Sequence, residues 1–190
     1  MIILASSSQY RKELLNRLAL EFNTIAAEID EDKYKNKNLD HIKIAETLSL
    51  EKAKEVQRNN LDAIIIGSDQ VLSFEGEIFD KPMSEKKALE QLSRLQGKSH
   101  QLITSFSIIR KEKVITETVI ANMYMKKLEN DQIINYVKKD MPLYCCGSYK
   151  LESLGIALFD KIECEDDTSI IGLPLLKLIK ALESFDIKIL

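Results

Sequence analysis

A carboxylate and an amide follow a short apolar run near the middle of the chain. The run covers residues 63–66, ends at Gly67, and is followed closely by Asp69 and Gln70. Its length and its β-branched residues predict a strand that is covered on both faces. Ligands of open α/β sheets usually bind at the carboxyl ends of strands, so Asp69 and Gln70 are candidates for contact with a ligand at such an end. An Asp in this context more commonly caps a turn, and the surrounding residues must decide between the two roles.

A basic residue, Lys81, is expected close to Asp69. Residues 71–74 and 77–79 are typical of two strands joined by a tight turn at Glu75 and Gly76. Lys81 follows the second of these strands. A hairpin would therefore bring an acid and a base to the same end, around one pocket.

The amino-terminal segment is expected to bind an anion. Residues 2–5 predict a short buried strand, and the serines at 6–8 are candidate caps for a helix that begins after them. Such a junction exposes backbone N–H groups and the positive end of a helix dipole. The dipole alone would favour acids in the first turn, so Arg11 and Lys12 indicate a nearby phosphate. An ordinary capped helix with solvated basic residues fits this segment equally well.

Acidic residues at 30–32 follow a predicted strand at 22–29. Such a triplet is either a solvated loop or a source of the hard oxygen ligands that Mg²⁺ prefers. Residues 33–40 predict a loop, and residues 40–59 predict an amphipathic helix. Lys52 lies in the second half of that helix, where a lysine by itself indicates only a solvated face.

The remainder of the chain predicts a mixed sheet. Helices are expected at 84–95, at 128–139 and from 172 to 183, and strands at 100–109, 114–125 and 156–162. Four charged residues, 110–113, would join two of these strands as a hairpin, so the sheet is not purely parallel. The chain lacks the glycine-rich phosphate motifs of dinucleotide and P-loop folds, which agrees with a mixed sheet. Residues 144–155 predict a loop that holds Glu152.

The size and charge of the chain restrict its class. The 190 residues carry a net charge of −3, which predicts one domain over residues 1–190 and no broadly basic surface for nucleic acid. An RNA-binding module is excluded on the same ground, and a small anionic ligand is favoured. The odd number of cysteines and the scarcity of histidine predict a reduced cytoplasmic protein without a zinc site. The apolar start is too short for a signal sequence, no membrane partner is expected, and a homodimer is left open.

Taken together, these fragments resemble the Maf family of nucleoside triphosphate pyrophosphatases over nearly the whole chain. The resemblance is carried by residues 4–12, 30–31, 67–71, 81–82, Thr104, 147–152 with Gly155, and 172–175. It implies an elongated mixed α/β sheet with flanking helices and two lobes around a cleft, similar to the inosine triphosphate pyrophosphatases. It also implies hydrolysis between the α and β phosphates of a nucleotide, dependent on a divalent cation, Mg²⁺ or Mn²⁺.

The resemblance further assigns roles to single residues. Asp69 matches the catalytic acid or base of the family, and it either orients the water or holds the metal. Glu31 matches a family acid that helps to hold the metal. The positions that bind the triphosphate are matched by Ser6, Ser8, Arg11, Lys12, Lys52 and Lys81.

Three positions that follow substrate choice in the family are occupied here by Tyr10, Gln70 and Glu152. Members of the dTTP/UTP type look like Arg, Thr and Gln at these positions, and members of the 7-methyl-GTP type look like Trp, Gln and Glu. This chain matches the second pattern at two positions. A 7-methylguanine ring is cationic, so Tyr10 would attract its face, though less strongly than an indole, and Glu152 would accept hydrogen bonds from its edge.

Some residues depart from the family pattern. Ser105 and Ser153 stand where glycine is usual, and Ser153 would alter its loop if that position needs a positive φ. Cys146 replaces a usual alanine and is expected to be a small packing residue.

Two other functions fit the resemblance. One is a pyrophosphatase for dTTP and UTP, which the identities of Tyr10 and Glu152 disfavour. The other is a regulator of cell division that binds a nucleotide without turning it over. The intact pair of Asp69 and Lys81 favours an enzyme.

Overall fold

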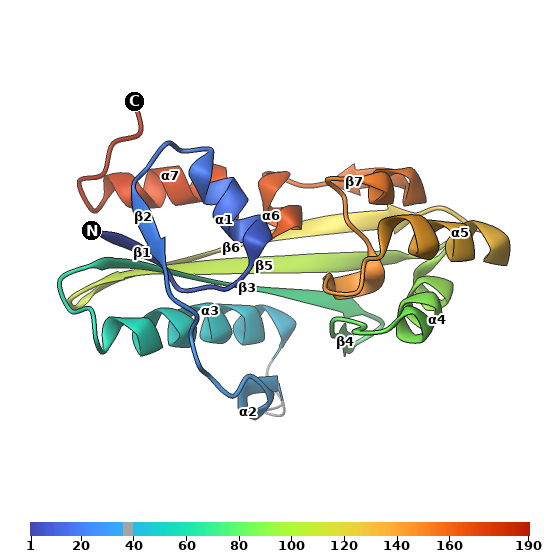
Figure 1. Cartoon of the computed structure of the whole chain (residues 1–190), viewed down its shortest axis with the longest axis horizontal. Helices are drawn as coiled ribbons and strands as arrows, with labels where there is room; N and C mark the ends of the chain where they lie inside the picture. The colour runs from blue at the N-terminus through green and yellow to red at the C-terminus, as the bar shows by residue number, and fades with distance from the viewer. Residues whose placement is uncertain (36–39) are drawn as a thin grey trace. The chain divides into compact units, whose positions relative to one another are not determined.

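The computed structural model of the protein describes residues 1–35 and 40–190 (Figure 1). The strands are β1 (Ile2–Leu4), β2 (Phe22–Thr24), β3 (Ile64–Phe74), β4 (Glu77–Phe79), β5 (Ser99–Arg110), β6 (Lys113–Met125) and β7 (Phe159–Glu163). The helices are α1 (Gln9–Asn16), α2 (Asp32–Lys35), α3 (His41–Gln57), α4 (Glu85–Leu95), α5 (Asn130–Asp140), α6 (Thr168–Ile171) and α7 (Leu175–Glu183), and the 3₁₀ helices are η1 (Cys146–Ser148) and η2 (Leu154–Leu158).

The strands form one mixed sheet, in the order β2-β1-β3-β5-β6-β7, with β4 paired to β3. Strand β1 is parallel to β2 and β3, whereas β4 is antiparallel to β3 and β7 is antiparallel to β6. The prediction of a mixed α/β sheet with flanking helices is therefore confirmed. Within the described residues, no helix is both long and apolar enough to cross a lipid bilayer.

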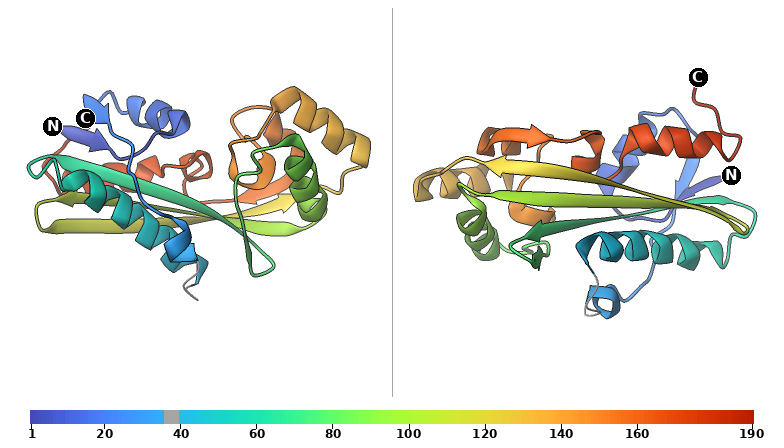
Figure 2. Two further views of the ribbon diagram at one scale, coloured as in Figure 1. Left: turned by 60° about the horizontal axis from the view of Figure 1, so that its bottom comes forward. Right: turned by 180° about the vertical axis from the view of Figure 1, so that it is seen from behind.

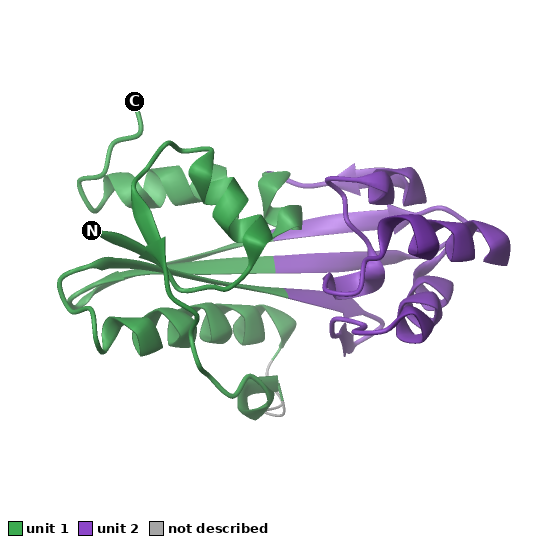
Figure 3. Cartoon of the chain, in the orientation of Figure 1, with its two compact units in different colours: residues 1–70, 104–119, 166–190 green, residues 71–103, 120–165 purple. Residues whose placement is uncertain are grey.

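The chain divides into two compact units (Figure 3). Unit 1 contains residues 1–70, 104–119 and 166–190, and unit 2 contains residues 71–103 and 120–165. The long strands β3, β5 and β6 contribute residues to both units. The expectations of a single domain and of a cleft between two lobes stay predictions.

Helices cover both faces of the sheet in unit 1, with α1 and α7 on one side and α3 on the other (Figures 1 and 2). Leu4 and Ile66 belong to an apolar cluster with residues of α1 and α7. Ile65 belongs to a second cluster, with Ala53 and Val56 of α3. Successive strand residues point to opposite faces, so a strand between two helical layers needs an unbroken apolar run. This is why the sequence of β3 predicts a doubly covered strand correctly.

Helix α3 approaches β3 very closely at Gly67. A Cβ atom added to Gly67 would lie 2.2 Å from the backbone oxygen of Ser49 and 2.8 Å from the backbone nitrogen of Ala53. Gly67 therefore makes room for the helix and does not end the strand, which continues to Phe74. The prediction that Asp69 follows a strand end is wrong, because Asp69 lies within β3.

Buried hydroxyl groups also fix α3 on the sheet. The Oγ of Ser49 lies 3.2 Å from the Oγ of Ser105 and 3.0 Å from that of Ser107, and all three residues are buried. Ser107 is also hydrogen-bonded to Thr116, at 2.8 Å. Ser105, a departure from the family pattern, thus uses its hydroxyl to join the helix to β5.

Several predicted elements have different bounds. Strand β2 ends at Thr24 rather than at residue 29, because its only described partner, β1, has three residues. Strand β7 begins at Phe159 rather than at 156, because η2 occupies the preceding residues. Within the predicted loop at 33–40, helix α2 extends to Lys35, and residues 36–39 lie outside the described residues.

The other predicted elements have bounds within three residues of those predicted, and the last helix begins at Leu175 rather than at residue 172. Ser84 caps α4 by accepting a hydrogen bond from the backbone N–H of Lys87. The hairpin between β5 and β6 has a turn of two residues rather than four, because Arg110 and Lys113 belong to the strands. Helix α6 was not predicted, since its four residues are too few to show a helical period.

A buried histidine lies in unit 2. The Nε2 of His100 lies 2.8 Å from the hydroxyl of Tyr149, and both rings pack near Phe159. In the described part of the chain, Nδ1 of His100 has no hydrogen-bond partner. Burial lowers the pKa of His100 to about 4, because the charged imidazolium loses its hydration there.

We expect Gly67→Ala to destabilise the protein far more than Gly76→Ala. The added methyl group at Gly67 would overlap backbone atoms of α3, which costs about 3 kcal/mol or more. Gly76 has a φ of +81° but no atom near its Cβ position, so alanine there costs only about 1 kcal/mol of backbone strain. Urea unfolding of the two variants measures the difference, and similar losses in both would contradict the close approach of α3.

Acid should destabilise the protein through His100. The unfolded histidine titrates near its ordinary pKa of 6.5, so between pH 6.5 and about 4 the unfolded chain binds a proton that the folded chain does not. This contribution to stability is complete above pH 6.5, and about 3 kcal/mol of it is lost as the pH falls to about 4. Urea unfolding across this range should show that the free energy of unfolding falls more steeply with decreasing pH in the wild type than in His100→Gln. Parallel curves would refute the assignment.

Candidate active site

The carboxylate of Asp69 is buried in unit 1 and paired with a lysine. Asp69 is only 6% exposed, and its Oδ1 lies 2.6 Å from Nζ of Lys52 on α3. The same Nζ lies 2.7 Å from Oε1 of Glu31. Lys52 adjoins Ala53, the residue that touches Gly67, so the close approach of α3 brings the ammonium group to β3. One cation is therefore held between two carboxylates.

Burial and neighbouring cations act in opposite directions on the pKa of Asp69. Burial raises the pKa of Asp69, and the positive charges of Lys52 and Arg11 oppose that rise. The nearby carboxylate of Glu31 adds to the rise. An acid with a raised pKa, held among cations, has the proton affinity and the setting of a catalytic base.

Arg11 is anchored by a carbonyl from the carboxyl-terminal part of the chain. Its Nε donates a hydrogen bond to the backbone oxygen of Gly172 at 2.9 Å, and its Nη1 donates to Oγ of Ser6 at 3.4 Å. The same Gly172 oxygen accepts a hydrogen bond from Ser68, at 2.9 Å. Gly172 has a φ of +125°, and a Cβ atom there would lie 3.4 Å from Nε of Arg11. The backbone conformation therefore favours glycine here, whereas a Cβ atom would only touch the Arg11 side chain.

The serine turn before α1 is built as predicted. Ser8 is the N-cap, and its Oγ accepts a hydrogen bond from the backbone N–H of Arg11 at 3.4 Å. The backbone N–H of Ser8 in turn donates to Oγ of Ser6 at 3.1 Å. Lys12 is exposed on the first turn of the helix. Anion binding by this turn stays a prediction.

Gln70 joins β3 to two other segments of unit 1. Its Nε2 lies 2.9 Å from Oγ1 of Thr104, 2.9 Å from the backbone oxygen of Ser169 and 3.0 Å from that of Ile170. Thr104 also donates to the oxygen of Ser169, at 2.8 Å. The amide nitrogen of Gln70 is thus directed at acceptors on β5 and α6. Its contact with a substrate base stays a prediction.

The other predicted site residues lie in both units. Tyr10 is half-buried on α1 in unit 1, whereas Lys81 and Glu152 belong to unit 2. The predicted hairpin is confirmed, because Leu72 of β3 pairs with Phe79 of β4, two residues before Lys81. A shared pocket for Lys81 and Asp69 stays a prediction, as does the role of Glu152.

Ser153 stands where the family usually has glycine, but its backbone does not have a positive φ. Ser153 has a φ of −133°, so this position does not need glycine. Its hydroxyl donates to the carboxylate of Asp140 instead. A serine here therefore fits the loop without strain.

Glu31 and Asp69 are the residues predicted to hold a divalent cation, and metal binding by them stays a prediction. Oxygens of both carboxylates already converge on one positive atom, Nζ of Lys52. In the described part of the chain, no group of three or more histidine, cysteine, aspartate or glutamate side chains could hold a metal by itself. Mg²⁺ is usually bound by one or two carboxylates together with water and substrate phosphates, so the two acids fit such an ion.

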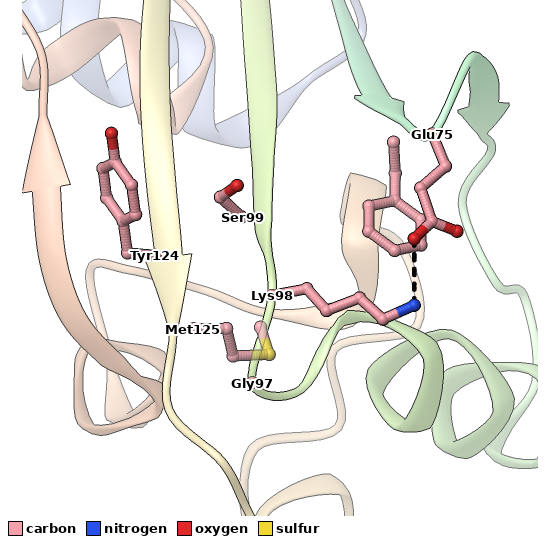
Figure 4. A pocket seen from close by; sticks show the side chains of 7 residues that line it. Glu75, Gly97, Lys98, Ser99, Tyr124 and Met125 are labelled. Atoms are coloured by element: carbon pink, nitrogen blue, oxygen red, sulfur yellow. Dashed lines mark hydrogen bonds and ion pairs between the residues drawn. The ribbon is translucent and has the colours of Figure 1, made fainter.

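Unit 2 contains a separate pocket of about 550 Å³ (Figure 4). It is lined by Phe74, Glu75, Gly97, Lys98, Ser99, Tyr124 and Met125. Nζ of Lys98 lies 2.9 Å from Oε1 of Glu75, so these two charges of the lining are paired with each other. None of the site residues predicted from the sequence lines this pocket.

Sequence reasoning missed two groups that organise the site in unit 1. Ser68 donates hydrogen bonds to the backbone oxygens of Gly172 and Ser105, and the Gly172 carbonyl holds Arg11. The signal in the sequence was the run Gly172-Leu173-Pro174, which predicted only the start of a helix. A glycine that precedes a helix-starting proline by two residues is a signal for a special backbone conformation.

Comparison with known proteins gives one consistent result. The family model described as "Maf-like protein" matches residues 1–185. A 7-methyl-GTP pyrophosphatase of Bdellovibrio bacteriovorus is 46% identical over 183 residues, which cover 96% of each chain. A 7-methyl-GTP pyrophosphatase of Aliivibrio fischeri is 38% identical over 191 residues, which cover 100% of this chain and 98% of the relative.

One solved structure, a HAM1 protein from Coxiella burnetii, has a TM-score of 0.45 and 12% identity. The match covers 96% of this chain and 98% of the HAM1 chain, and the similarity is too weak to support a conclusion.

We expect Lys52→Met to raise the pKa of Asp69 above its wild-type value. Among the groups that oppose the rise, Lys52 has the largest effect, through its charge and its hydrogen bond. Carbon-13 NMR titration of the Asp69 carboxyl group measures the change. Lys54→Met is the matched control, because Lys54 lies on the same helix and pairs with Glu51 instead. An unchanged titration in Lys52→Met would contradict the pairing.

Proposed function

The chain belongs to the Maf family, and from this premise we propose that it hydrolyses 7-methyl-GTP to 7-methyl-GMP and pyrophosphate. It is thus a hydrolase of the nucleoside triphosphate pyrophosphatase type. The proposed substrate rests on the relatives that match over nearly their full length, which are 7-methyl-GTP pyrophosphatases. The arrangement of Asp69, Lys52 and Arg11 in unit 1 supports the chemistry.

In this reaction, a water oxygen attacks the α-phosphorus, and the bond from that phosphorus to the α–β bridging oxygen breaks. Negative charge grows on the phosphoryl oxygens and on the departing pyrophosphate, so catalysis depends on positioning and on electrostatic stabilisation. We assign the proton of the attacking water to Asp69, whose raised pKa favours protonation at the moment of attack. Its cationic neighbours favour the ionised form and so oppose the effect of burial.

Cationic side chains would bind the triphosphate. Lys52 and Arg11 are fixed in place by their hydrogen bonds, and both are close enough to Asp69 to affect its pKa. Ser6 and Ser8 would offer hydroxyl and backbone donors beside the start of α1. Lys12 and Lys81 would supply further charge, according to the family pattern.

A divalent cation, Mg²⁺ or Mn²⁺, is part of this proposal. Glu31 and Asp69 would hold it, with the second oxygen of Asp69 left for the attacking water, because one oxygen of each acid already lies within 2.7 Å of one positive atom. When bound, the ion would neutralise charge on the phosphate oxygens. Lys52 occupies the place between the two acids, so we expect its ammonium group to turn toward the substrate phosphates in the loaded enzyme.

The base would be recognised by Tyr10 and Glu152. The aromatic ring would stack on the cationic 7-methylguanine, and the carboxylate would accept hydrogen bonds from N1–H and the 2-amino group. We assign Gln70 a supporting role, because its amide nitrogen ties β3 to the segment before Gly172. A cytoplasmic location, with the three cysteines of the described chain outside any disulfide in a reducing compartment, belongs to the same proposal.

The test is pyrophosphate release from 7-methyl-GTP, GTP, dTTP, UTP and CTP with Mg²⁺ or Mn²⁺. We expect a preference for 7-methyl-GTP that is lost when the metal is chelated. Asp69→Asn should lower kcat by about 100-fold or more, the contribution of a general base. Asp62→Asn is the control, because Asp62 is an exposed acid in the turn before β3. A preference for pyrimidine nucleotides would overturn the proposed substrate, and no turnover of any nucleotide would overturn the proposed activity.

A further inference from the structure

Residues 150–155 of unit 2 form a tight turn that carries Glu152 at its tip. The backbone N–H groups of Ser153 and Gly155 both donate to the backbone oxygen of Lys150, at 3.3 Å and 3.0 Å. A Cβ atom added to Gly155 would lie 2.3 Å from that oxygen, so only glycine allows the turn to close. Glu152 lies between the two ends of this closure.

A buried carboxylate, Asp140, holds the turn from outside. Asp140 is the last residue of α5 and is 9% exposed. The Oγ of Ser153 lies 2.7 Å from its Oδ1 and 2.9 Å from its Oδ2, and the hydroxyl of Tyr136 donates to Oδ2 at 2.8 Å. Nζ of Lys150 lies 3.7 Å from Oδ1. Asp140 thus contacts one residue before the tip of the turn, Lys150, and one after it, Ser153.

The hydroxyl of Tyr136 completes this attachment. It donates to Asp140 and accepts a hydrogen bond from the backbone N–H of Lys150, at 3.1 Å. Burial and the hydrogen bond to Asp140 both raise the pKa of Tyr136, so it remains a neutral donor at physiological pH. Lys150, two residues before the tip, and Ser153, the residue after it, are therefore both tied to α5, through Tyr136 and Asp140, which lie one helical turn apart.

Glu152 itself takes no part in this network. It is exposed, and within the described residues it makes no hydrogen bond or ion pair. The turn thus has a fixed backbone and an unpaired carboxylate at its tip. A side chain that must read the edge of a planar base needs such a frame, because a mobile frame would lose conformational entropy on binding.

We propose that Asp140 and Ser153 are positioning residues that fix the direction of Glu152 and thereby determine selectivity for a guanine-type base. The proposal rests on the proposed function and adds to it. The hydroxyl of Ser153 is the link between the carboxylate of Asp140 and the tip of the turn. Loss of this link leaves the residues assigned to phosphate chemistry untouched, so it should change the choice of base and not the cleavage step.

The experiment compares kcat/KM for 7-methyl-GTP and for UTP in the wild type, Ser153→Ala, Ser153→Thr and Ser93→Ala. We expect Ser153→Ala to lower the ratio of the two values about tenfold, through KM for 7-methyl-GTP, which corresponds to about 1.4 kcal/mol. Ser153→Thr keeps the hydroxyl and should retain the ratio. Ser93, an exposed serine of α4 in the same unit, is the control and should retain it as well.

A double-mutant cycle with Glu152→Gln tests whether Ser153 acts through Glu152. In the Glu152→Gln background, Ser153→Ala should change the ratio by less than about twofold, because the group that it positions is already impaired. Asp140→Asn, which keeps one acceptor oxygen, should shift the ratio in the same direction as Ser153→Ala. Thermal unfolding of each variant checks that it is folded at the assay temperature.

The outcomes separate the two levels of the argument. A wild type that hydrolyses 7-methyl-GTP, with a ratio unchanged in Ser153→Ala, would overturn the positioning role and leave the proposed function intact. Equal losses of kcat/KM for 7-methyl-GTP and UTP in Ser153→Ala would also overturn it, since they would indicate a structural role only. The same holds if the effects of Ser153→Ala and Glu152→Gln on the ratio add fully in the double variant. A wild type that does not hydrolyse 7-methyl-GTP would overturn the proposed function and this inference together.

Discussion

The backbone of α3 touches the backbone of β3 at Gly67, and the arrangement of charges in unit 1 depends on that contact. A side chain at Gly67 would overlap Ser49 and Ala53. With the helix so close, Lys52 reaches Asp69 with a short hydrogen bond and also meets Glu31. The buried serine hydroxyls beneath α3 add directional bonds, which fix the rotation of the helix as well as its distance. The packing of α3 on β3 thus decides which cation lies beside the buried acid.

Much of this fold could be predicted because its signals are local. The apolar run of β3 shows a strand covered on both faces, and Ser8 and Ser84 show where helices begin. The turn signal at residues 75–76 predicts a hairpin, and β3 and β4 form that hairpin in the structure. Each of these features depends on residues within a few positions of one another. The residues proposed to act on the phosphates follow from the family resemblance, which places them in order along the chain, and their roles stay predictions.

The errors arose where a residue serves a distant partner. Gly67 suggested the end of a strand, but its role is to admit α3, so Asp69 lies within β3 and not after it. The role of Ser153 was missed as well, because its hydroxyl binds Asp140 and no pattern in the sequence links the two. The carbonyl of Gly172 could not be identified either, because its partners are far away along the chain. Contacts of this kind leave no periodic signal, so only the three-dimensional structure shows them.

The double attachment of Arg11 has a thermodynamic consequence. Its guanidinium group is fixed by the carbonyl of Gly172 and the hydroxyl of Ser6 before any ligand arrives. Immobilising a long side chain on binding usually costs about 1 kcal/mol of rotamer entropy, and here folding has already met that cost. The Gly172 carbonyl also gains from the arrangement, because donors from Arg11 and Ser68 occupy both of its lone pairs. An anion approaching this corner of unit 1 would meet an oriented cation, and the nearby carbonyl oxygen would repel it less.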